Sequence, residues 1–102
     1  MAGELQVASL AVGTAAVQVP VTLPSVGAPI TFGMKILGRA ANSGKIYVGV
    51  TSGVTTSTGA LVPNGDPGTT FPYVVPAQHF LSGGLVWLIS DTSSQTVDWS
   101  VA

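Results

Sequence analysis

Glycine and proline interrupt this chain at short, regular intervals, and β-like segments fill the spaces between them. The chain has 13 Gly and 7 Pro, and the densest turn cluster spans residues 63–68. No window combines apolar residues at helical spacing with good helix formers, whereas strand-favouring valine and threonine are abundant. Turns about ten residues apart are typical of antiparallel β folds. The pattern predicts an all-β protein of seven to eight strands, either a single antiparallel β-sandwich or a small β-barrel.

Alternation of apolar and polar residues locates the individual strands. Residues 17–23 alternate but contain prolines, which cannot donate to a ladder, so they read as an edge strand or an extended arm. The longest expected strand is 30–41, with Ile30, Phe32, Met34 and Ile36 on one face and Leu37 on the other. The other expected strands are 45–50, 60–62, 69–76, 85–90 and 95–101, and residues 77–81 are expected to form one turn of helix.

The last two strands are expected to form a hairpin. Residues 91–94 (Asp-Thr-Ser-Ser) have the composition of a tight turn between them. The first of the two strands is apolar at nearly every position, which is typical of a central strand covered on both faces. Both tryptophans, Trp87 and Trp99, are therefore expected in the core.

No internal repeat or linker divides the sequence. We expect one β domain over residues 1–102, with residues 1–29 forming either an extended N-terminal arm or edge strands. The start of the chain carries Glu4 and lacks the basic residues of a signal peptide, so it is interpreted as mature protein.

Charged residues are unusually scarce. They make up 7% of the chain, against about 25% in an average soluble protein. The charged residues are Glu4, Lys35, Arg39, Lys45, Asp66, Asp91 and Asp98. With a formal net charge of −1, the monomer has weak electrostatic protection against association. The composition suggests a surface that other subunits cover, although an apolar secreted monomer would have a similar composition.

The same composition argues against two classes of partner. Three basic residues cannot neutralise a row of phosphates, so nucleic acid is not an expected partner. The longest run of large apolar residues, 85–89, is far shorter than the roughly 20 that cross a bilayer, so no membrane is expected either.

No catalytic group can be assembled from the sequence. His79 is the only histidine, no Gly-x-Ser-x-Gly motif accompanies it, and the acidic residues are dispersed. Asn64 and Asp66 would supply only two oxygen ligands to a calcium ion. There is no cysteine for a thiolate zinc site. We therefore expect no enzyme activity, no metal site and no cofactor.

Partner contacts are predicted from edge-strand and turn positions. The alternating segment at 17–23 could pair with a neighbouring chain by β-addition. Aromatic side chains near proline turns can reach the rim of an interface. The predicted contact residues are Val17, Val19, Val21, Phe71, Tyr73, His79, Phe80 and Leu81.

Residues 42–102 carry a family resemblance. The runs Gly44-Lys45-Ile46-Tyr47-Val48-Gly49, 54–59 (VTTSTG), 61–66 (LVPNGD), 86–90 (VWLIS) and 95–99 (QTVDW) resemble a pattern in small virion surface proteins of tailed phages, of the head decoration and head fibre type.

This resemblance implies a β domain on the particle surface. The expected function is a capsid decoration (cement) protein that binds the major capsid protein and stabilises the phage head. Such a protein would be made in the host cytoplasm and assembled into the virion. Repeated binding at symmetric sites suits a homo-oligomer, with a trimer favoured. The alternative is a receptor- or glycan-binding module of a tail or head fibre, using exposed Trp87, Trp99 or Tyr73.

Overall fold

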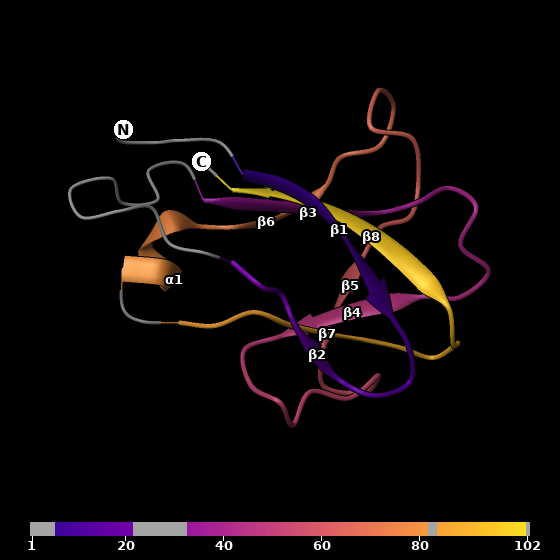
Figure 1. The fold of residues 1–102 in the computed structure, drawn as a ribbon, viewed down its shortest axis with the longest axis horizontal. Helices are drawn as coiled ribbons and strands as arrows, with labels where there is room; N and C mark the ends of the chain where they lie inside the picture. The colour runs from indigo at the N-terminus through magenta and orange to yellow at the C-terminus, as the bar shows by residue number, and fades with distance from the viewer. Residues whose placement is uncertain (1–5, 22–32, 82–83, 102) are drawn as a thin grey trace.

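The computed structural model describes residues 6–21, 33–81 and 84–101 (Figure 1). In these ranges the chain forms eight strands and one five-residue helix. The strands are β1 (Gln6–Val12), β2 (Val17–Gln18), β3 (Met34–Gly38), β4 (Ile46–Gly49), β5 (Ala60–Val62), β6 (Tyr73–Val75), β7 (Trp87–Ser90) and β8 (Gln95–Val101), and the helix α1 (Ala77–Leu81) lies between β6 and β7.

The strands form two four-stranded sheets. Sheet A has the order β1-β8-β3-β6 and sheet B the order β2-β7-β4-β5. All pairings between these strands are antiparallel. The all-β prediction is confirmed, and of its two alternatives the structure takes the sandwich.

The pairing follows a nested rule. The first strand pairs with the last, β2 with β7, β3 with β6 and β4 with β5. Two further pairings, β3 with β8 and β4 with β7, join these pairs into sheets. A long antiparallel hairpin rolled across two facing layers has this connectivity, which defines the eight-stranded jelly roll.

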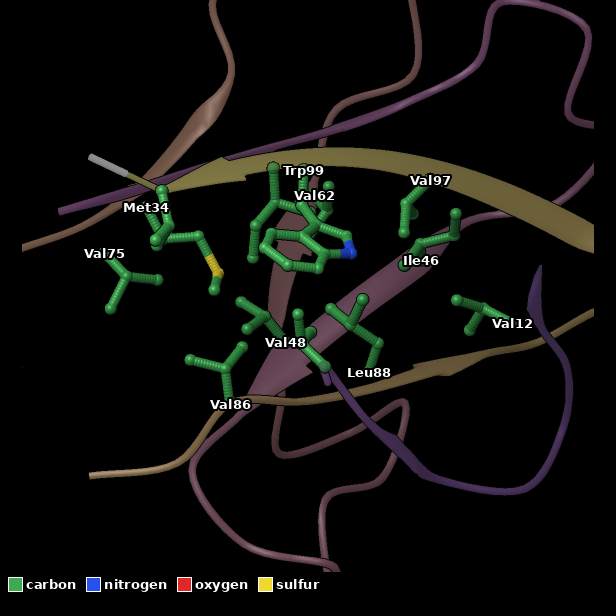
Figure 2. Close-up of a cluster of buried hydrophobic side chains, with 13 residues drawn as sticks. Val12, Met34, Ile46, Val48, Val62, Val75, Val86, Leu88, Val97 and Trp99 are labelled. Carbon is green, nitrogen blue, oxygen red and sulfur yellow. The ribbon is translucent and has the colours of Figure 1, made fainter. Parts of the chain in front are cut away.

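The core lies between the two sheets. Along β8 every second residue is buried, which places Gln95, Val97 and Trp99 toward sheet B. Figure 2 shows the Trp99 ring pointing from β8 toward Val48 and Leu88 of the opposite sheet. Trp99 Nε1 is buried without a hydrogen-bond partner among the described residues, a loss of about 1–3 kcal/mol that the surrounding apolar packing must exceed.

Several predicted strands are longer than the observed ones. The segment expected at 30–41 forms a strand only over Met34–Gly38. It ends there because the chain turns, with Asn42 N donating to Arg39 O at 3.0 Å. Met34 and Ile36 are buried as expected, and Ile30 and Phe32 lie outside the described residues. Leu37, expected on the outer face, is also buried because Pro67 and Pro72 lie beside it.

A second overprediction lies at residues 69–76, where only Tyr73–Val75 are extended. Thr69 N and Thr70 N both donate to Asp66 O, so the preceding residues form a turn. The segments at 60–62, 77–81 and 95–101 have the predicted bounds.

The expected terminal hairpin is wrong. β7 belongs to sheet B and β8 to sheet A, so residues 91–94 cross between the sheets. β7 is buried on one face only, through Leu88 and Ser90. Trp99 lies in the core as predicted, but Trp87 is only half-buried and lies outside the core cluster. Local turn composition does not distinguish a hairpin from a connection between layers.

The N-terminal segment supplies edge strands. β1 pairs with β8 along its whole length and is the outer strand of sheet A. β2 pairs with β7 and is the outer strand of sheet B. Residues 6–12 and 17–18 thus form edge strands, whereas residues 1–5 and 22–29 lie outside the described residues.

Candidate partner-binding surfaces

The helix α1 lies at one end of the sandwich (Figure 1), and five of the predicted contact residues line hollows beside it: Val19, Val21, Tyr73, His79 and Phe80. The helix begins after Pro76, whose carbonyl accepts from His79 N at 3.1 Å. His79 Nε2 lies 2.8 Å from Leu85 O, so this nitrogen carries the proton and donates it to the carbonyl. The ring also meets Phe80 edge-on, at 5.5 Å between centroids. His79 thus ties the helix to the segment that enters β7.

Two apolar hollows flank this helix. The first, of about 160 Å³, is lined by Val19, Val21 and Phe80 among others, and the second, of about 200 Å³, by Tyr73 and His79 among others. Small-molecule sites usually enclose about 300–1,000 Å³. Each hollow therefore has the size of one or two side chains from a partner and is small for a substrate.

Phe71 lies apart from this group. Its side chain is 92% exposed, the most exposed of the large hydrophobic residues in the described ranges. It lies near the end of the connection between β5 and β6, whose start is held by the hydrogen bonds of Gly38 N to Pro63 O and Gly65 N to Gly38 O, each 2.9 Å. The loop therefore presents an unpacked aromatic ring and is anchored at its start.

The remaining predicted contacts differ in accessibility. Val17 and Val21 are half-buried and pack against the core. Val19 is 2% exposed, so its side chain belongs to the core and is not available to a partner. Its backbone N instead donates to Val86 O at 2.9 Å. Leu81 ends α1, and its side chain lies outside the described part of the chain.

The outer face of sheet B was not predicted as a candidate surface. Tyr47 lies opposite both Leu61 and Ile89, and Trp87 lies opposite Gly49. Leu61 is 54% exposed, and the other three large side chains are half-buried. The positions facing outward from the four strands of this sheet carry no charge. In the sequence, this face corresponds to the positions of β4, β5 and β7 that alternate with the buried ones. These positions would be polar on a solvated face, but here they carry Tyr47, Leu61, Trp87 and Ile89.

The outer face of sheet A carries charged side chains instead, beside exposed Val7 and Val74. Arg39 Nη2 and Nε donate to the two carboxylate oxygens of Asp98, both at 3.1 Å, and Ser9 Oγ donates to Asp98 Oδ1 at 2.6 Å. Hydrogen bonds from Arg39 and then Ser9 lower the pKa of Asp98, against a smaller opposing effect of desolvation. The two outer faces of the sandwich therefore differ in chemistry.

The described residues contain no group of three or more His, Cys, Asp and Glu side chains placed to hold a metal ion. In the same ranges, no helix is long and apolar enough to span a membrane.

Fold and surface together define a jelly-roll β-sandwich with one uncharged outer face and an exposed aromatic loop. Comparison of the chain with family models, with curated proteins and with solved structures found no match.

Proposed function

We propose that this protein is a structural component of a phage particle, a decoration (cement) protein that binds the major capsid protein on the outside of the head and stabilises it. It acts by protein association, without catalysis or a cofactor, and joins the virion after synthesis in the host cytoplasm. The jelly roll is common in viral capsid proteins, which supports the proposal by analogy of fold.

The observation that carries this proposal is the exposure of Phe71. An aromatic ring that is 92% exposed contributes almost no burial energy in the free protein. It contributes hydrophobic free energy to binding when a partner covers it. Binding energy in interfaces concentrates in a few such anchors, and aromatic residues are enriched among them. Thr69 N and Thr70 N donate to Asp66 O and hold the turn just before Phe71, which reduces the ordering that binding must supply.

Replacement of the ring tests the proposal. Phe71→Ala is expected to weaken co-sedimentation with purified phage heads by roughly 30-fold or more, which corresponds to the loss of about 2 kcal/mol typical of an interface anchor. The unfolding midpoint of the free protein should stay unchanged, because the ring contacts little in the folded chain. Thr69→Ala, an exposed position on the same loop, serves as the control.

The heads provide a second measurement. Wild-type protein should raise the temperature at which they open, and Phe71→Ala should raise it less. If wild-type protein does not co-sediment with heads, the proposed function is wrong. If Phe71→Ala binds as tightly as wild type, the ring does not contact the capsid.

A glycan-binding module remains the second candidate, because jelly rolls also include lectin domains. Trp99 cannot take part because it is buried, whereas Trp87 and Tyr73 are half-buried and partly accessible. A glycan array followed by tryptophan quenching separates the two candidates. A glycan that quenches wild type but not Trp87→Phe would favour the fibre module.

A further inference from the structure

We propose that β1 is a self-pairing edge, through which two copies of this chain join their A sheets antiparallel about a twofold axis at Ser9. This inference deepens the proposed function, because it specifies the contact between neighbouring decoration subunits. It rests on a surface distinct from the Phe71 loop.

Among the described strands, β1 is the longest strand at a sheet edge. The other edge strands, β2, β5 and β6, have two, three and three residues, whereas β1 has seven. Only one side of β1 is paired, with β8. The other side presents backbone N–H and C=O groups that no described residue pairs with. An open edge of this length is a template for another strand.

The edge also lacks the features that usually prevent strand addition. Its sequence, QVASLAV, contains no charged residue and no proline. Ala8 faces the core side of the sheet, opposite Trp99, yet it is exposed, and Leu10 is only half-buried. The core side of β1 is therefore open toward its Ala8 end, whereas Val12 at the other end is buried in the core. A further strand beside β1 would cover the Ala8 and Leu10 side chains.

The side chains of β1 complement those of a second copy in one register. Centring an antiparallel pair on Ser9 aligns all seven residues, and it places Leu10 opposite Ala8 and Val7 opposite Ala11. Leu10 and Val7 then each meet an alanine, one pair on each face of the sheet, and Val12 lies opposite Gln6 at the two ends of the pair. The two Asp98 carboxylates would lie three strands apart, roughly 14 Å, and each is already paired with Arg39.

The contact is small, which determines where it acts. A seven-residue strand pair extends about 23 Å. A contact of one strand with one strand buries less surface area than the roughly 1,200 Å² that a stable complex buries. Free subunits should therefore associate only at high concentration. Subunits held side by side on a particle have a much higher effective concentration, so the same contact would form there.

A disulfide trap tests the pairing directly, because the chain has no cysteine of its own. Directly opposed residues of an antiparallel pair have Cα atoms about 4.5–5.5 Å apart, within the range of about 4.4–6.8 Å that a disulfide spans. Ser9→Cys should form a covalent dimer under mild oxidation at least tenfold faster than two controls. Ala11→Cys tests the register, because its two copies would lie about 14 Å apart, and Ser57→Cys tests random collision at an exposed loop.

Light scattering completes the test. Wild type should approach the mass of two chains as concentration rises, whereas the trimer favoured by the sequence would approach three. Ser9→Cys that crosslinks no faster than Ser57→Cys, or a mass that stays at one chain or reaches three, would overturn the twofold pairing. Co-sedimentation with heads alongside failure of the trap would refute only this inference, and the reverse result would refute only the proposed function.

Discussion

Asp98 shows how a single residue organises the outer face of sheet A. It accepts hydrogen bonds from side chains of two different elements, Ser9 of β1 and Arg39 just after β3. These bonds favour the carboxylate over the protonated acid, so the pKa in the folded state lies below that of the unfolded chain. The carboxylate therefore stabilises the fold above the unfolded pKa of about 3.9, and this contribution is lost as the pH falls through the lower, folded pKa.

Asp98→Asn should accordingly destabilise the protein at pH 7 and have little effect near pH 2. The difference should be modest and should shrink with added salt, because the two side chains of the ion pair are 53% and 42% exposed. Urea unfolding of wild type and variant at both pH values measures it. An equal difference at pH 7 and pH 2 would show that the carboxylate charge is not the cause.

At the scale of elements, the connection from β3 to β4 has to cross between the sheets. Asn42 holds it in place: its Nδ2 donates to Thr96 O at 2.8 Å and Asn64 Oδ1 at 3.0 Å, and its Oδ1 accepts from Thr96 N at 3.0 Å. Asn64 in turn donates to Gly44 O at 2.8 Å. These amides satisfy backbone groups that no strand partner reaches.

Asn42→Ala removes three of these hydrogen bonds and leaves Thr96 N and Asn64 Oδ1 without this partner, while Thr96 O still accepts from Arg39 N. We expect a loss of about 2–3 kcal/mol in the free energy of unfolding. Ser43→Ala is the matched control, because its hydroxyl accepts only one long hydrogen bond, 3.3 Å from Gln95 Nε2. Chemical denaturation measures both variants. Equal stability of the two would mean that the connection is held by packing instead.

At the scale of the whole molecule, the nested topology joins the ends of the chain. Gln6 lies opposite Val101, so β1 and β8 cannot pair until the chain between them is largely organised. Closing such a long loop costs conformational entropy, and this cost precedes the formation of the stabilising contacts. Folding is therefore slow.

Refolding is therefore expected in milliseconds to seconds, as for other β-sandwiches. A Trp87→Phe variant leaves buried Trp99 as the only tryptophan, so its fluorescence in stopped flow reports formation of the core. Refolding within microseconds would contradict the nested pairing order.

The sequence by itself determined the β character and the local extent of several elements. The segment at 95–101 could be predicted because its alternation is complete, and that at 77–81 because proline precedes it and glycines follow it. The contact prediction for Phe71, Tyr73 and Phe80 rested on similar local signals, since these aromatic residues lie near proline turns.

Only the tertiary structure decided which sheet each strand joins, because a turn such as 91–94 has the same composition whether it closes a hairpin or crosses between layers. That choice buried Trp99 and Val19 while leaving Trp87 at the surface. It also placed β1 at an open edge and left Phe71 exposed. Burial depends on what packs across from a residue, and local sequence does not contain that information.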